Sequence, residues 1–234
     1  ATEYAEIMAT IAVNLQAVRS RIARAAEAAI RLPEDIQLLA VSKTFGAALI
    51  HEAWCAEQHA FGENFVQEAI DKARELANPG IEWHFIGPIQ SNKTRLIAGH
   101  FAWVHSIERE KIAQRLNDAR PAHLPPLNVL IQVNVSGEAS KSGVAPGEER
   151  ALAAAIRTLP RLQLRGLMTI PEPTADAAVR RARFAHLREL LQPLQAADAA
   201  VDTLSMGMSD DLEEAIAEGA TLVRVGTAIF GRRA

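Results

Sequence analysis

The residues best suited to chemistry are a lysine at the end of an apolar run and a glycine-threonine pair near the C-terminus. Leu38-Leu39-Ala40-Val41-Ser42 leads directly into Lys43. So short an apolar run is typical of a strand buried on both faces of a parallel sheet, and such folds place ligands at the carboxyl ends of the strands. Desolvation there disfavours the charged amine, and a neutral lysine can attack a carbonyl to form an imine. The alternative is a surface lysine that follows a core strand.

The glycine-threonine pair has the features of a phosphate cradle. Gly226-Thr227 follows an apolar run, and glycine lets the backbone approach an anion closely. Ser205 and Ser209 add hydroxyl donors after the preceding run, and we expect Asp210 to begin a helix whose N-terminus also favours an anion. Ordinary turn and capping chemistry is the alternative for these residues.

Arg224 and His84 are polar residues inside apolar runs. Arg224 lies within Leu222-Val223-Arg224-Val225, and strand alternation puts it on the same side as Gly226. We expect it to face a ligand beside the phosphate, with a structural salt bridge as the alternative. For His84 a hydrogen-bonded core histidine is favoured over a general base.

Together these groups predict a ligand that carries both an aldehyde and a phosphate. Pyridoxal 5′-phosphate (PLP) fits this description, and so do the sugar-phosphate aldehydes of Schiff-base aldolases. A metal site is not predicted, because Asp210-Asp211 and Glu213-Glu214 are typical of the first turn of a helix and the chain has no ligand spacing of His and carboxylates.

Composition narrows the class of protein. The 234 residues are 49% hydrophobic with a formal charge of −3, so nothing points to nucleic acid or to a membrane surface. No apolar run approaches the roughly 18 residues of a membrane span. The single cysteine, Cys55, excludes an internal disulfide, and we expect it to be a buried thiol in a helix. We therefore expect a soluble, cytoplasmic protein.

The chain alternates strand-like and helix-like segments after a leading helix. That helix falls within residues 1–32, before Pro33, and its apolar face is formed by Ile7, Ile11, Leu15, Val18 and Ile22. Eight strands are predicted, at Gln37–Ser42, His59–Gly62, Glu82–Ile86, Phe101–Ile107, Asn128–Val135, Leu164–Ile170, Thr203–Met206 and Thr221–Gly226. Seven helices are predicted between them, at Ala47–Gln58, Val66–Ala77, Asn92–Ala98, Arg109–Ala119, Glu148–Thr158, Asp176–Leu194 and Asp210–Glu218.

This alternation predicts an α/β fold with parallel strands. Eight units close into a single (β/α)₈ TIM barrel, which predicts one domain over residues 1–234 with the first helix packed on it. An open doubly wound sheet is the competing arrangement, and the lack of a Gly-x-Gly-x-x-Gly turn after the first strand counts against it.

The chain resembles the PLP homeostasis protein family in a series of motifs that occur in the same order from about residue 36 to residue 231. The motifs are Leu39-Ala40-Val41-Ser42-Lys43-Thr44, Phe61-Gly62-Glu63-Asn64-Phe65, Trp83-His84-Phe85-Ile86-Gly87-Pro88, Val104-His105-Ser106-Ile107, Gln132-Val133-Asn134-Val135 with Lys141-Ser142-Gly143, Arg165-Gly166-Leu167-Met168, Leu204-Ser205-Met206-Gly207-Met208-Ser209 and Val223-Arg224-Val225-Gly226-Thr227.

The resemblance implies a barrel like the N-terminal domain of alanine racemase, with PLP, a form of vitamin B6, held as a Schiff base on Lys43. It implies that Arg224 meets the pyridine nitrogen and that Ser209, Gly226 and Thr227 bind the phosphate, with Ser205 nearby. It places Asn64, His84 and Met168 around the cofactor. One departure is that many members have a proline shortly after Ser-Lys-Thr, where this chain has Phe45-Gly46-Ala47. The departure affects the expected start of the next helix and leaves Lys43 matched.

The resemblance also implies a role in PLP homeostasis and supply rather than catalysis. Because the chain ends at Arg233-Ala234, we expect it to lack the second domain that gives alanine racemase its tyrosine base, so racemisation should be poor. The expected partners are PLP and PLP-dependent apoenzymes, with no nucleic acid and no membrane, and the expected state is a monomer. The alternatives are a PLP-dependent amino-acid racemase or lyase with weak activity, and a Schiff-base aldolase.

Overall fold

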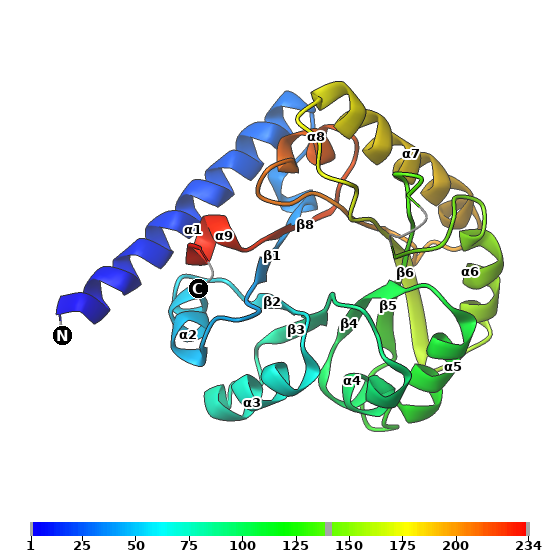
Figure 1. Cartoon of the computed structure of the whole chain (residues 1–234), viewed down its shortest axis with the longest axis horizontal. Coiled ribbons are helices and arrows are strands. Elements are labelled where there is room, and N and C mark those ends of the chain that lie inside the picture. Colours follow the sequence, from blue (N-terminus) through cyan, green and yellow to red (C-terminus); the bar gives the residue numbers. More distant parts are fainter. Residues whose placement is uncertain (1, 139–141, 233–234) are drawn as a thin grey trace.

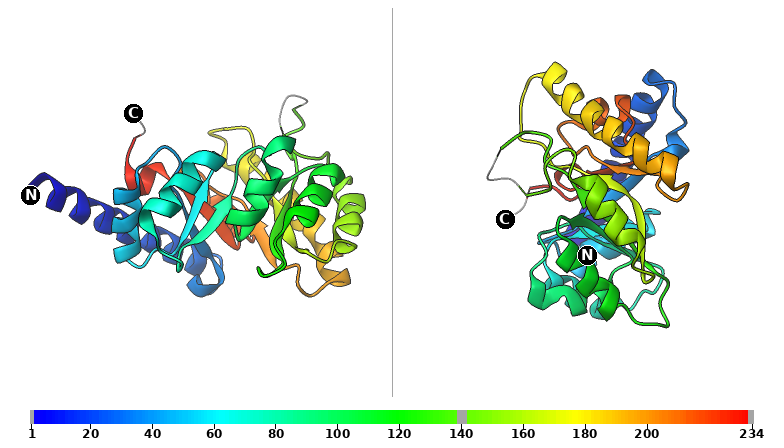
Figure 2. Two further views of the ribbon diagram at one scale, coloured as in Figure 1. Left: turned by 90° about the horizontal axis from the view of Figure 1, so that it is seen from below. Right: turned by 90° about the vertical axis from the view of Figure 1, so that its right-hand side faces the viewer.

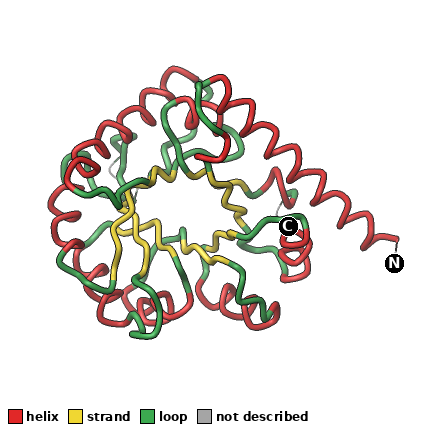
Figure 3. The backbone as a smooth tube through the Cα atoms, turned by 180° about the vertical axis from the view of Figure 1, so that it is seen from behind, coloured by secondary structure: helices red, strands yellow, loops and turns green. Residues whose placement is uncertain are grey.

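Eight parallel strands close into a barrel, in which each strand is hydrogen-bonded to the next in sequence and β8 pairs with β1 (Figures 1 and 3). This computed structural model describes residues 2–138 and 142–232, without the side chains of residues 4 and 7–9. The predicted Ile7 side chain and Lys141 therefore lie outside the described residues. The strands are β1 (Gln37–Val41), β2 (Ala60–Glu63), β3 (Glu82–Phe85), β4 (Trp103–Ile107), β5 (Leu127–Gln132), β6 (Leu162–Met168), β7 (Thr203–Ser205) and β8 (Leu222–Val225).

Helices follow the strands and form the outer layer (Figure 2). Their apolar faces pack on the outward side chains of the strands in one continuous core. The α-helices are α1 (Thr2–Ala28), α2 (Ala47–Cys55), α3 (Val66–Leu76), α4 (Thr94–His100), α5 (Glu110–Ala119), α6 (Glu149–Arg157), α7 (Ala177–Ala197), α8 (Leu212–Ala217) and α9 (Thr227–Phe230), and the short 3₁₀ helices are η1 (Pro33–Asp35) and η2 (Ser91–Lys93). No helix in the described part of the chain is long and apolar enough to cross a membrane.

The leading helix α1 packs along α2, α8 and α9, and its N-terminal end extends past the barrel (Figures 1 and 2). The predicted apolar residues from Ile11 to Ile22 are buried in this contact. Polar side chains fix it further: Asn14 Nδ2 donates to the carbonyl oxygen of Ile229 at 2.9 Å, and Arg19 Nη1 donates to that of Ala56 at 2.8 Å. The helix is therefore joined both to the start and to the end of the barrel.

The barrel interior has chemically distinct sectors. Leu39 and Val41 belong to an apolar cluster with side chains of β2, the β3–α4 loop and β8, and this cluster is separate from the outer core. Trp103, Leu130 and Met168 form a second apolar cluster. The remaining sector is polar, which is costly unless every buried group is hydrogen-bonded.

The structure confirms the predicted fold class and differs from the predicted strand ends by up to three residues. The largest difference is at β5, which was predicted to reach Val135 and ends at Gln132. The next residue, Val133, still donates its N–H to the carbonyl oxygen of Met168 in β6 at 2.9 Å, and it forms an isolated bridge with Val144. The expectation of a buried thiol was wrong: Cys55 ends α2 on its solvent side and is exposed, with Sγ 3.5 Å from His51 Nε2.

Candidate functional site

The register of β1 and β8 places Lys43 and Gly226 at the same end of the barrel. Leu39 pairs with Arg224, and Ala40 pairs with Val225. Gly226 follows Val225 directly, and Lys43 lies three residues beyond Ala40, half-buried in the turn that leads to α2. This end carries the carboxyl ends of all the strands, where (β/α)₈ barrels place their active sites.

Hydrogen bonds hold the backbone on both sides of Lys43. Lys72 Nζ, from α3, donates to the carbonyl oxygen of Ser42 at 2.9 Å, and the N–H of Thr44 donates to Glu68 Oε1 at 2.5 Å. Lys72 and Glu68 also form an ion pair, with 2.6 Å between Nζ and Oε1. Thr44 has φ of 69°, a left-handed conformation that costs a non-glycine residue free energy and is found where surrounding contacts impose it. These contacts fix the position from which the Lys43 side chain emerges.

A buried acid at the end of β2 completes this support. Glu63 Oε1 is 2.7 Å from Lys72 Nζ, and both side chains are almost fully buried. Burial raises the pKa of Glu63 to about 7, against the opposing effect of Lys72. Lys72 thus connects the residue after β1, Ser42, with Glu63 of β2 and with Glu68 of its own helix.

Arg224 extends from β8 into the polar sector of the barrel interior. Its side chain is 3% exposed, Nη1 donates to Ser205 Oγ at 2.6 Å, and Nη2 donates to the carbonyl oxygen of Thr169 at 2.8 Å. Burial lowers its pKa to about 10, so the guanidinium remains a cation at neutral pH. The predicted salt-bridge alternative is not what holds it, since both of these partners are neutral.

The polar sector continues from Ser205 across the barrel through two histidines. Ser205 Oγ is 2.9 Å from His105 Nδ1, and His105 Nε2 is 2.8 Å from His84 Nδ1. His84 Nε2 is 2.7 Å from Glu82 Oε1, at the opposite end of the barrel. Burial lowers the pKa of both histidines, whereas the hydrogen bond from His84 lowers the pKa of Glu82. Both imidazoles are therefore neutral at pH 7.

The loops after β7 and β8 lie against each other, as the phosphate-cradle prediction requires. Thr227 Oγ1 and Ser209 Oγ are 3.5 Å apart. Arg21 Nη2 of α1 donates to the carbonyl oxygen of Ser209 at 2.9 Å, which fixes that loop from outside the barrel. Asp211, rather than the predicted Asp210, precedes α8, and its Oδ1 accepts the N–H of Met208 at 2.7 Å.

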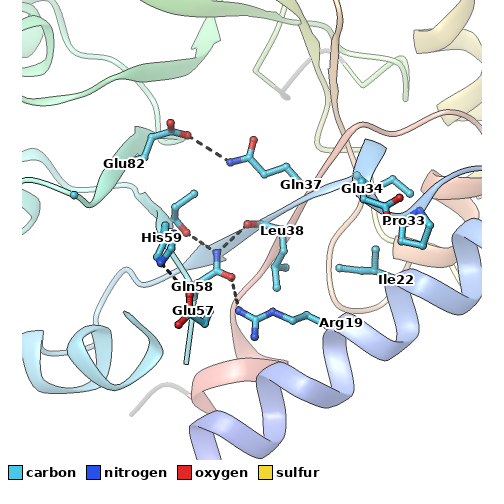
Figure 4. Close-up of a pocket in the computed structure, with 13 residues that line it drawn as sticks. Arg19, Ile22, Pro33, Glu34, Gln37, Leu38, Glu57, Gln58, His59 and Glu82 are labelled. Carbon is cyan, nitrogen blue, oxygen red and sulfur yellow. Dashed lines mark hydrogen bonds and ion pairs between the residues drawn. The ribbon is translucent and has the colours of Figure 1, made fainter. Parts of the chain in front are cut away.

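A cavity of about 450 Å³ lies beside Arg224. Gly207, Met208 and Asp211 line it on one side, and the chain from Ile170 to Ala175 lines it on the other. Lys43 is not part of its lining, so the structure relates the lysine to this cavity through the β1–β8 register alone. A separate cavity of about 540 Å³ lies at the opposite end of the barrel, at the start of β1, β2 and β3 (Figure 4).

The other predicted site residues have different surroundings. Asn64 follows β2 at the Lys43 end of the barrel, and its Oδ1 is buried without a hydrogen-bond partner among the described residues. Gly87 lies so close that a Cβ atom there would be 2.6 Å from the carbonyl oxygen of Asn64. Met168 is fully buried in the cluster with Trp103 and Leu130. His84 lies in the interior chain, two hydrogen bonds away from Ser205.

No role in the site was predicted for the supporting residues Lys72, Glu68, His105 and Glu82, although His105 stands in one of the quoted motifs. A signal for Glu82 was present, since it lies two residues before the predicted His84 on one strand and therefore shares its face. Lys72 and Glu68 are four residues apart on α3, a spacing that is common in solvated helix pairs and gave no reason to expect a contact with β1. Among the described residues, no group of His, Cys, Asp and Glu could hold a metal ion.

Comparison with known proteins first defines the class of the barrel. The family model of the alanine racemase N-terminal domain matches residues 13–234. The alanine racemase of Corynebacterium glutamicum superposes with a TM-score of 0.71 at 16% identity, over 95% of this chain and 60% of that one. This likeness establishes the fold.

Closer relatives define the family. The pyridoxal phosphate homeostasis protein of Pseudomonas aeruginosa is 63% identical over 226 residues, which cover 97% of each chain. The structure of PipY from Synechococcus elongatus with PLP bound has a TM-score of 0.82 and 39% identity, over 94% of this chain and all of that one. The chain belongs to the pyridoxal phosphate homeostasis protein family.

Proposed function

We propose that this chain binds PLP at the Lys43 end of the barrel and acts in PLP homeostasis and supply. The observation that carries the proposal is the β1–β8 register, which brings the end of the strand before Lys43 beside Arg224 and Gly226. Relatives support it, since the Pseudomonas aeruginosa protein is named for pyridoxal phosphate homeostasis and the PipY structure is described with PLP bound.

The residues at this end of the barrel fit PLP. Ser209 and Thr227 bring hydroxyl groups together at Gly226, and a phosphate needs several such donors. Asn64 Oδ1 is a buried acceptor without a partner in the described chain, as expected of a group that is satisfied only when a ligand is present. Arg224 adds a cation on the floor of the site.

In this proposal each residue has a defined task. Bound PLP supplies an aldehyde carbon that condenses with a primary amine and releases water. Lys43 provides that amine, so that the cofactor is held as a Schiff base. Ser209, Gly226 and Thr227 bind the phosphate, Asn64 and Met168 border the ring, and Ser205 and His84 lie behind Arg224.

Arg224 favours storage over catalysis. A guanidinium can only donate hydrogen bonds, so opposite the pyridine nitrogen it keeps that nitrogen unprotonated. An unprotonated ring is a weaker electron sink for amino-acid chemistry. The chain has a single tyrosine, Tyr4, in α1, so a tyrosine base like that of alanine racemase has no counterpart among its residues in the barrel.

A PLP titration followed by absorbance tests the proposal. The wild type should develop the visible band of an imine and Lys43→Ala should not, whereas Lys111→Ala, which removes an exposed lysine of α5, should behave as wild type. A wild type that stays unchanged with PLP, or a Lys43→Ala band equal to that of wild type, would overturn the proposal. Exchange of the α-proton of amino acids in deuterated water, abolished by Lys43→Ala, would instead indicate a racemase or lyase.

The proposal extends to the whole chain and its partners. We propose that residues 1–234 form one PLP-binding domain, of which α1 is a part, and that it acts as a monomer that passes PLP to PLP-dependent apoenzymes. The test compares the rate at which an apoenzyme is activated by the PLP-loaded chain with the rate at which free PLP at the same concentration activates it. A faster rate with the loaded chain would support this role, and equal rates would contradict it.

A further inference from the structure

A continuous line of hydrogen bonds crosses the barrel from Arg224 to Glu82. The successive distances are 2.6 Å from Arg224 to Ser205, 2.9 Å from Ser205 to His105, 2.8 Å from His105 to His84 and 2.7 Å from His84 to Glu82. The three groups between the ends are fully buried. The line begins at the proposed PLP site and ends at the opposite mouth of the barrel.

The two ends of the line determine the direction of every hydrogen bond in it. Arg224 can only donate, and an ionised Glu82 can only accept. Ser205 therefore accepts from Arg224 and donates its hydroxyl proton to His105 Nδ1. Each histidine then accepts at Nδ1 and donates from Nε2, so that the last bond runs from His84 Nε2 to Glu82 Oε1. Both imidazoles are neutral in this arrangement, in agreement with the effect of burial on their pKa.

Reversing the line would disturb the hydroxyl group that Arg224 contacts. If His105 carried its proton on Nδ1, it would donate to Ser205 Oγ, and the hydroxyl proton would lose its acceptor in the line. The oxygen has two lone pairs and could accept from both Arg224 and His105, but the hydroxyl would have to rotate toward a new acceptor, and this rotation would shift the oxygen's lone pairs relative to Arg224. The ionised carboxylate at the far end prevents this reversal, because it can only accept a hydrogen bond and so requires the proton of His84 on Nε2.

We propose that Glu82, His84 and His105 are positioning residues that hold Ser205, and through it Arg224, in the orientation that the PLP ring requires. This inference rests on the proposed function. It assigns a role in the site to Glu82, which lies across the barrel from Lys43 and has a side chain that is 43% exposed. Glu82 also lines the cavity of Figure 4, where Gln37 Nε2 donates to its Oε1 at 3.4 Å.

The first test needs neither PLP nor a variant. Long-range ¹H–¹⁵N NMR spectra of the wild type without PLP should show His84 and His105 neutral, each with its proton on Nε2. An Nδ1–H tautomer or an imidazolium at either position would overturn the proposal. Because this measurement does not involve PLP, its outcome is independent of the proposed function.

The second test removes the acceptor at the far end. Glu82→Met should leave the histidine tautomers mixed and raise the Kd of PLP about tenfold, with a shifted band of the bound cofactor. Glu82→Gln retains an acceptor oxygen, so it should keep the wild-type tautomers and most of the affinity. Glu34→Met is the matched control, since it removes a carboxylate from the same cavity without touching the line.

If Glu82→Met lost PLP affinity without a change in the histidine tautomers, Glu82 would not act through the histidines. If the tautomers became mixed while the affinity stayed at the wild-type value, the line of hydrogen bonds would not position Arg224 for PLP. If Glu82→Met does not fold, Glu82→Asp takes its place, because the shorter side chain withdraws the carboxylate from His84. A wild type that does not bind PLP would refute the proposed function and leave the tautomer test standing.

Discussion

Lys72→Met should destabilise the fold, and the loss should grow with pH. Lys72 Nζ contacts Glu63 Oε1 at 2.7 Å, Glu68 Oε1 at 2.6 Å and the carbonyl oxygen of Ser42 at 2.9 Å. Methionine keeps most of the volume of the side chain and removes the charge. The Glu63 side chain is 1% exposed, so its carboxylate would be left buried without a cation. Breaking a buried pair in this way costs about 3–5 kcal/mol.

The pH dependence follows from the pKa of Glu63. This pKa is about 7 in the folded protein and 4.5 for the unperturbed group, so the folded state binds the proton more tightly. Its protonation therefore contributes stability that is fully present below pH 4.5 and is lost as the pH rises to 7. At about 1.4 kcal/mol per pKa unit, the difference of 2.5 units corresponds to roughly 3.5 kcal/mol. This pKa already includes the lowering effect of Lys72, so in the variant it should rise above 7 and the destabilisation should continue to higher pH.

Urea unfolding followed by tryptophan fluorescence at pH 5.5 and at pH 8 measures the effect. At pH 5.5 Glu63 is protonated in the variant, and the loss should be about 1–2 kcal/mol, close to the value of the hydrogen bond to Ser42. At pH 8, one unit above the pKa of Glu63 in wild type, it should grow by up to about 1.4 kcal/mol and reach roughly 3 kcal/mol. Adding Glu63→Gln to Lys72→Met should restore part of the stability at pH 8, because no buried carboxylate is then left without a cation. The control variant Lys111→Met should change the stability little at either pH. A loss that is equal at both pH values, or larger at pH 5.5, would refute the reasoning.

Four further variants test the barrel and the site. Gly166→Ala should abolish folding or cost more than about 3 kcal/mol, because a Cβ atom there would overlap the carbonyl oxygen of Thr203 at a φ of +155°. Gly99 lies in α4, and a Cβ atom there would have no neighbour within 4 Å, so Gly99→Ala should stabilise the fold by about 0.5–1 kcal/mol in the same urea assay. Similar stability changes for Gly166→Ala and Gly99→Ala would contradict this reasoning. Arg224→Lys should raise the Kd of PLP at least tenfold, because an ammonium cannot reach both Ser205 and Thr169 as the guanidinium does, and unchanged binding in a titration would exclude Arg224 from the site. Ser209→Ala should weaken PLP and leave the affinity for pyridoxal, which lacks the phosphate, unchanged; equal losses for both would place the phosphate elsewhere.

The sequence predicted the barrel because its determinants are local. Each strand and helix is a short segment with its own apolar pattern, and eight alternating units have few ways to pack. The element ends were less predictable where tertiary contacts continue past the strand, as at Val133, which follows β5 and forms an isolated bridge with Val144. Cys55 was misjudged because a helical pattern does not reveal which residue of the last turn faces solvent.

The sequence identified those site residues that carry a charged side chain within or directly after an apolar strand. Arg224 in an apolar strand and Lys43 at a strand end stand out in the sequence. Lys72 and Glu68 do not, because they resemble an ordinary helical ion pair until α3 is placed against the end of β1. The interior line from Glu82 to Arg224 depends on side chains of four different strands, and only the closed barrel brings them into contact.

The most direct measurement of the central claim is the mass of the peptide that contains Lys43 after the PLP-loaded protein is reduced with borohydride. We predict that this peptide gains the mass of a reduced pyridoxyl phosphate group, that the gain is lost in Lys43→Ala and that it persists in Lys111→Ala. A wild type that binds PLP but carries the label on another lysine would contradict the account.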